Sequence, residues 1–127
     1  MIRSLACVAL VTLLAVPSTA KQRRGPQPGS LDPTFGTNGK VTLDFASDQD
    51  VASGVVVQAD GRIVVAGMAR EGGKARFAVA RLTAAGAPDT TFGTGGKVVF
   101  DVSEGNEGAG GVALQPDGKI VVVGTAC

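Results

Sequence analysis

The chain has 127 residues and a formal net charge of +1, so it offers neither a large core nor a strong general attraction for polyanions. It contains no His, Trp or Tyr, which excludes a His-based catalytic triad and an imidazole metal site within this sequence. Glycine occurs 19 times. This frequency favours turns and short strands over helices beyond the N-terminal segment.

Residues 1–20 have the pattern of a secretory signal peptide. Arg3 is followed by an uncharged run from Leu5 to Val16 that is short for a bilayer span. Small residues precede the expected cleavage point after Ala20. We therefore expect a secreted, periplasmic or cell-surface protein with no membrane insertion after cleavage. An uncleaved membrane anchor is the alternative.

Residues 21–30 have the composition of a linker, with three basic residues, two prolines and two glycines. A solvated tail is the expected role, and contact with anionic lipid or nucleic acid is the alternative. Residues 31–127 hold eight basic and eleven acidic side chains, a net charge of −3. This acidic body disfavours nucleic-acid binding, so we expect no nucleic-acid partner.

The chain beyond the linker is an internal repeat with a spacing of 57 residues. The spacing holds without a gap from Asp32 and Asp89 to Ala69 and Ala126. A fixed period of this length is typical of repeat architectures. It divides the chain into repeat 1 at 31–87 and repeat 2 at 88–127, which is truncated.

A complete repeat is expected to contain four strands. In repeat 1 these are residues 40–45, 53–58, 62–69 and 75–82. Asp60-Gly61 and Asp117-Gly118 lie between β-branched runs and predict hairpin turns. Further turns are expected at 71–74 and 84–89, which contain glycines or proline.

Four short antiparallel strands per unit are typical of one β-propeller blade. The predicted fold is therefore all-β, with tandem four-stranded antiparallel β-propeller-like blades, incomplete at about two blades. The repeat partner of Phe77 would be residue 134, so repeat 2 lacks its fourth predicted strand. A truncated member of a longer array is the favoured interpretation. Self-association through open blade faces and an open two-sheet sandwich are the alternatives.

The repeated motifs TFGTxGK and DGxIVVxG occur once in each copy, in the same order and spacing. With these motifs, residues 31–127 resemble the delta-60 repeat, a bacterial β-rich repeat found in tandem in secreted and surface proteins. The resemblance implies propeller-like folding. It implies no established activity and assigns no functional residues.

The acidic loops are the candidate ligand sites, because clustered carboxylates can bind Ca²⁺. A solvated loop between strands is the simpler explanation. The two loops occupy equivalent positions in the two repeats and contain Asp44, Asp48 and Asp50 in the first and Asp101, Glu104 and Glu107 in the second. Asp32 and Asp89, which precede Thr-Phe-Gly, are expected to close turns by bonding the backbone.

Phe35 and Phe92 follow these turns and are expected to anchor each connector to its blade, with sugar stacking as the alternative. Cys127 would be the single thiol after signal cleavage. We assign no catalytic, cofactor-binding or metal residues and no cofactor. The expected function is a non-enzymatic exported repeat protein, a scaffold or interaction module with an unknown protein or surface partner. The alternatives are a calcium- or carbohydrate-binding surface domain, or a fragment of a propeller enzyme whose active site lies on other blades.

Overall fold

The computed structural model describes residues 27–45 and 48–127. The chain divides into two units, residues 1–30 and residues 31–127. The predicted signal peptide and its cleavage point lie outside the described residues. The described part contains six antiparallel strands and no helix, so it also contains no helix able to cross a membrane.

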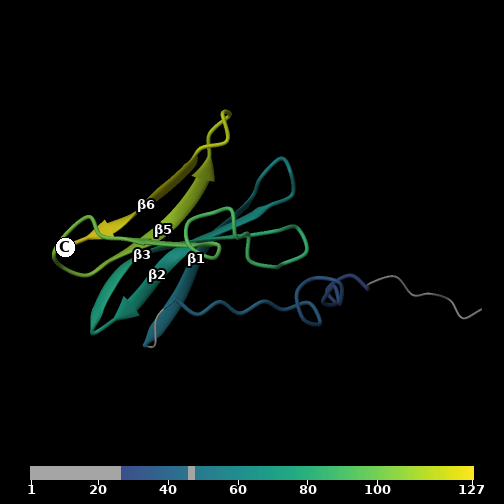
Figure 1. Cartoon of the computed structure of the whole chain (residues 1–127), viewed down its shortest axis with the longest axis horizontal. Coiled ribbons are helices and arrows are strands. Elements are labelled where there is room, and N and C mark those ends of the chain that lie inside the picture. Colours follow the sequence, from purple (N-terminus) through teal and green to yellow (C-terminus); the bar gives the residue numbers. More distant parts are fainter. Residues whose placement is uncertain (1–26, 46–47) are drawn as a thin grey trace, which may run out of the picture. The chain divides into compact units, whose positions relative to one another are not determined.

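The first sheet has four strands in the order β1-β2-β3-β4. Figure 1 labels β1, β2 and β3 of this sheet. The strands are β1 Gln49–Val57, β2 Ile63–Glu71, β3 Lys74–Leu82 and β4 Lys97–Phe100. The first three strands belong to repeat 1, whereas β4 comes from repeat 2. The sheet therefore crosses the boundary between the two sequence repeats.

The second sheet contains β5 Glu107–Leu114 and β6 Ile120–Ala126 (Figure 1). Its register repeats that of β1 and β2 at the 57-residue spacing. Val57 pairs with Ile63, and Leu114 pairs with Ile120. Each pair also contains an irregularity at the same repeat position, between Ala52 and Gly54 or between Ala109 and Gly111. The structure thus confirms an all-β fold of two propeller-like blades, the second of them incomplete.

The strand expected at residues 40–45 does not form, so that prediction is wrong for repeat 1. The equivalent segment in repeat 2 does form a strand, β4, because it pairs with β3. Lys40 and its neighbours have only isolated turn bridges. Strand formation here depends on a β3-type neighbour from the preceding repeat, which sequence pattern alone does not supply.

The two Asp-Gly dipeptides close three-residue hairpin loops. Gly61 N donates to Gln58 O at 2.9 Å, and Gly118 N donates to Gln115 O at the same distance. Both glycines have φ near +85°, which glycine adopts without a steric penalty. Asp60 Oδ1 accepts a hydrogen bond from Arg62 N, as expected for an Asp that stabilises its own turn.

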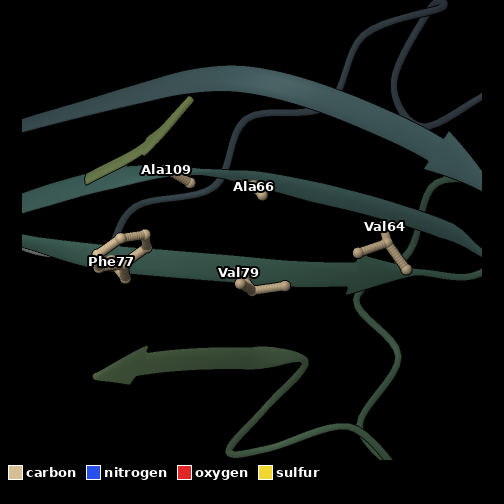
Figure 2. Close-up of a cluster of buried hydrophobic side chains, with 5 residues drawn as sticks. All are labelled: Val64, Ala66, Phe77, Val79 and Ala109. Atoms are coloured by element: carbon tan, nitrogen blue, oxygen red, sulfur yellow. The ribbon is translucent and has the colours of Figure 1, made fainter. Parts of the chain in front are cut away.

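The core lies between the two sheets. Figure 2 shows its buried side chains. Val64 is fully buried there, and burial of one such side chain contributes about 2 kcal/mol. Ala109 of β5 lies against the β2 and β3 side chains in this cluster, which consists of Val64, Ala66, Phe77, Val79 and Ala109. Phe100 of β4 stacks on Phe77 with ring centroids 5.2 Å apart. The face of sheet 1 that carries Val64 is therefore the side that packs against sheet 2.

The glycine that ends each Val-rich run is required by a close approach of the neighbouring strand. A Cβ on Gly67 would overlap the carbonyl of Val51 in β1. A Cβ on Gly124 would overlap the carbonyl of Gly108 in β5. Both contacts lie beside the strand irregularities, which bring the backbones together.

Candidate functional site

Asp50 and Glu107, which were expected in the acidic loops, lie instead at equivalent positions near the start of β1 and β5, and their carboxylates accept hydrogen bonds from backbone amides. Asp50 Oδ2 accepts a hydrogen bond from Phe45 N at 2.7 Å. Both carboxylate oxygens of Glu107 accept from Val102 N, at 3.1 and 2.8 Å. Glu107 is only 3% exposed. Each carboxylate holds the segment that enters its blade, so these two candidate calcium ligands have structural partners already.

The remaining acidic candidates are dispersed. Asp101 pairs with Lys74 at 3.2 Å and with Arg76 at 3.3 Å, and its hydrogen bond with Lys74 lowers the pKa of the carboxyl. Asp44, Asp48 and Glu104 are exposed. Within residues 27–45 and 48–127, no group of three or more His, Cys, Asp or Glu side chains is placed to hold a metal.

Among the described residues, the carboxylate of Asp89 has the most polar partners. Its Oδ2 atom lies 2.8 Å from Arg81 Nε and 2.9 Å from Arg62 Nε. Its Oδ1 atom accepts hydrogen bonds from the backbone amide and the hydroxyl of Thr91, at 3.1 and 2.6 Å. We call Arg62, Arg81, Asp89 and Thr91 the Asp89 cluster. It joins the start of β2, the end of β3 and the connector that leads to β4.

The Asp89 side chain is only 6% exposed, but its charged form is well supported. The hydroxyl and amide of Thr91, together with the Arg81 guanidinium, lower the pKa of Asp89 to about 2, against the opposing effect of burial. The carboxylate is therefore ionised at neutral pH. Because all of its near partners are donors that hold it in place, the arrangement suits a structural joint and offers no general base.

Asp32, the repeat partner of Asp89, has only the local half of these contacts. Asp32 Oδ1 accepts hydrogen bonds from the amide and hydroxyl of Thr34, as Asp89 does from Thr91. These bonds confirm the expected turn closure in both copies. Asp32 has no arginine partner in the described residues and is exposed, whereas Asp89 is buried.

Phe92 has the anchoring role expected for the Phe of the repeated motif. It packs against the core between the sheets, and Arg81 Cζ lies 4.7 Å from its ring centroid. The guanidinium covers one face of the ring and makes a cation–π contact. That face of Phe92 is therefore not free for a sugar.

An apolar hollow of about 410 Å³ lies on the face of sheet 1 opposite sheet 2. The segment 35–45 forms one wall through Phe35, and β1 and β2 form another through Val55 and Val65. In repeat 2, the equivalent residues Phe92, Val112 and Val122 pack into the core between the two sheets. The hollow therefore lies at the position in repeat 1 that corresponds to the interface between the two sheets. No complete sheet covers it among the described residues.

Sequence reasoning identified Asp89 as a turn residue but missed its two arginines. The sequence held little information about these contacts. Arg62 follows one turn motif and Arg81 precedes another, but neither lies at a spacing from Asp89 that indicates contact. Their convergence requires β2 and β3 to be adjacent and antiparallel. The pairing of Asp101 with Lys74 and Arg76 depends instead on the antiparallel pairing of β3 with β4.

Comparison with known families agrees with this geometry. Residues 58–92 and 115–126 match the model of a domain of unknown function (DUF5122) described as a β-propeller. The match is to a β-propeller domain. In this chain the matched segments of the DUF5122 model contain both Asp-Gly turns, the Val-rich strands β2 and β6, β3, and the connector with Asp89.

The comparison with curated proteins and the comparison with solved structures each gave no match. The likeness to the DUF5122 model therefore supports a propeller repeat and carries no activity with it. It includes the residues that build turns, strands and the Asp89 cluster. The matched residues are thus those that shape the blade.

Proposed function

We propose that this chain is an exported, non-enzymatic repeat protein of the delta-60 type that serves as a structural scaffold or protein-interaction module. The proposal rests first on the roles of its polar groups. Asp50, Glu107 and Asp89 each hold a connecting segment to a blade. Groups engaged in this way stabilise the fold and leave no evident acid–base pair for catalysis.

The observation that carries the proposal is the difference in burial between equivalent side chains. Val64 is 0% exposed, whereas Val121 at the same position of the next repeat is 38% exposed. Ala66 is 1% exposed, whereas its partner Val123 is 61% exposed. A surface built as a packing face but open to solvent is typical of a protein interaction site.

The proposal is tested first by recovering the protein from its producer and measuring its location and intact mass. We expect a species outside the cytoplasm that begins at Lys21. A cytoplasmic protein that retains residues 1–20 would contradict the exported role. Intact mass is the suitable readout because it also detects any residues that follow Cys127.

A calcium-binding role is the alternative that the same preparation can exclude. Because Asp50 and Glu107 already accept backbone hydrogen bonds, we expect added calcium to leave the melting temperature unchanged. Magnesium at the same concentration controls for ionic strength. A calcium-specific rise that is lost in Asp48→Asn would favour the calcium-binding alternative over the scaffold.

A further inference from the structure

Arg70, near the end of β2, is an arginine without a carboxylate partner. Arg62, Arg76 and Arg81 each form a salt bridge with an aspartate or a glutamate. All eleven acidic side chains of the sequence lie within the described residues, and none of them forms a salt bridge with Arg70. The Nε atom of Arg70 is buried and has no hydrogen-bond partner among the described residues. Because a charged donor is costly to bury without an acceptor, this guanidinium is suited to bind an anion from outside the chain.

Arg70 lines a hollow of about 380 Å³ between the two sheets, which we call the Arg70 pocket. One wall consists of β1, β2 and the start of β3, and the other consists of β5, β6 and the loop before β5. The pocket adjoins the core, because Ala109 belongs both to its lining and to the buried cluster. Its volume is within the range of sites for small ligands. Since described strands form both walls, the pocket does not depend on the outer face of either sheet.

The other polar groups of the Arg70 pocket are mainly donors. Ser53 contributes a hydroxyl. Asn106 accepts a hydrogen bond from Ala75 N through its Oδ1 atom at 2.9 Å, so its NH₂ group is the part that can donate to a ligand. Glu107 also lines the pocket, but both of its carboxylate oxygens accept from Val102 N. The groups that remain for a ligand therefore match an acceptor with a negative charge.

The two repeats differ at the polar positions of this pocket. The repeat equivalent of Arg70 is Cys127, and that of Ser53 is Gly110. The Asp-Gly turns and the register of the paired strands, in contrast, are the same in both copies. The geometry of a blade therefore does not require an arginine at this position. An arginine that the blade does not require and that no carboxylate pairs is a candidate for ligand binding.

We propose that the Arg70 pocket binds the carboxylate of a small aliphatic acid. The planar guanidinium of Arg70 can donate two parallel hydrogen bonds to the two oxygens of one carboxylate. Met68, Ala75 and Ala109 also line the pocket and provide an apolar surface for a short aliphatic chain. This binding site goes beyond the scaffold role proposed above and does not rest on it.

The first test is a titration of isotopically labelled protein with sodium butyrate, followed by two-dimensional NMR at constant ionic strength. We expect saturable shifts of the Arg70 Nε–H resonance and of the Gly108 backbone amide, with a dissociation constant in the millimolar range. Sodium chloride is the control for ionic strength and should not reproduce these shifts. Acetate should bind at least about threefold more weakly than butyrate, because it lacks the methylene groups that would contact the apolar surface.

Three variants test the role of the guanidinium. Arg70→Gln removes the cation and should weaken butyrate binding at least about tenfold. Arg70→Lys keeps the charge but loses the planar donor pair, and it should weaken binding at least about threefold. Lys40→Gln is the matched control, because Lys40 also has no salt bridge among the described residues but is exposed and lies outside the pocket. It should change binding by less than about twofold.

Four results would overturn the inference: no saturable shift at Arg70, equal shifts with sodium chloride, equal affinity for acetate and butyrate, or unaltered butyrate affinity of folded Arg70→Gln. Tighter binding of inorganic phosphate than of butyrate would overturn the assignment to a carboxylate. If circular dichroism shows that Arg70→Gln is misfolded, the Arg70 Nε–H shift of the unaltered protein and its preference for butyrate over acetate decide the outcome.

The binding site and the scaffold role fail separately. An exported protein that does not bind butyrate retains the scaffold role and loses this binding site. A protein that binds butyrate at Arg70 but remains in the cytoplasm contradicts the exported role and leaves the binding site in place.

Discussion

The same residue type has different surroundings in the two repeats, and Asp32 and Asp89 show why. Both aspartates close the turn before Thr-Phe-Gly by accepting a hydrogen bond from the backbone amide of the threonine two residues further on, Thr34 or Thr91. Only Asp89 follows a β3 strand, whose Arg81 reaches back to it at 2.8 Å. The local motif therefore determines the turn in both repeats. The strand of the preceding blade adds the arginine contact that buries Asp89.

Replacing the Asp89 carboxylate should destabilise the fold more than the same change at Asp32. Asp89→Asn leaves Arg62 and Arg81 without their shared carboxylate, and we expect the melting temperature to fall by about 5 °C or more. Asp32→Asn is the matched control and should lower it by less than about 2 °C. Thermal unfolding followed by circular dichroism measures both. Equal shifts would show that the arginines add nothing to the turn.

Acid should remove the contribution of Asp89 in a defined range of pH. Because the pKa of Asp89 is lowered from 3.8 to about 2 in the fold, its stabilisation is present above pH 3.8 and is lost as the pH falls toward 2. Urea unfolding across this range should show a steeper loss of unfolding free energy in the unaltered protein than in Asp89→Asn. Parallel curves would contradict the lowered pKa of this group.

At the scale of elements, sequence motifs predicted most of the strands. They did not predict that one sheet combines strands from both repeats. The Asp-Gly turns and Val-rich runs identified the β1-β2 and β5-β6 hairpins because these contacts are local. The wrong strand prediction at residues 40–45 and the unpredicted contacts of Arg62 and Arg81 with Asp89 have the same physical cause. Both depend on elements that lie elsewhere in the sequence. Lys97–Phe100 becomes a strand only because β3 offers it an edge, and an edge supplied by another element leaves no mark in the segment itself.

The close approach at Gly67 gives a test of the blade geometry. Gly67→Ala should destabilise the fold by about 2 kcal/mol or more, because the added methyl group overlaps the β1 carbonyl at Val51. Gly110→Ala is the control, since a Cβ there meets no atom closer than 4.0 Å. It should change stability by less than about 0.5 kcal/mol. Chemical denaturation compares the two, and a neutral Gly67→Ala would show that β1 can move away.

At the scale of the whole molecule, the interface between the two sheets is covered, whereas the equivalent faces on the outer side of each sheet are exposed. The inner face of sheet 1 is covered by sheet 2, whereas the equivalent face of sheet 2 exposes Val121 and Val123. On the other side, Val55 and Val57 of β1 are each 62% exposed. The two open faces are chemically the two halves of the covered interface.

This asymmetry predicts different effects for the same substitution in the two repeats. Val64→Ala should cost about 2 kcal/mol of unfolding free energy, because it leaves a cavity in the covered interface. Val121→Ala should cost less than about 0.5 kcal/mol in the isolated chain, because Val121 is partly exposed. Urea denaturation of the two variants at low protein concentration measures the difference. A large loss in Val121→Ala would mean that this face is already covered in solution.

The origin of β4 also affects how the protein is made. Because a ribosome delivers the chain from its N-terminus, β3 emerges before the strand that will cover its outer edge. The first sheet remains open until residues 97–100 have left the exit tunnel, by which time translation of the second repeat is well under way. Each blade of such an array is therefore completed by its successor, and a pause in translation at a stage when Leu82 but not Lys97 has left the exit tunnel would leave a nascent chain with an open strand edge.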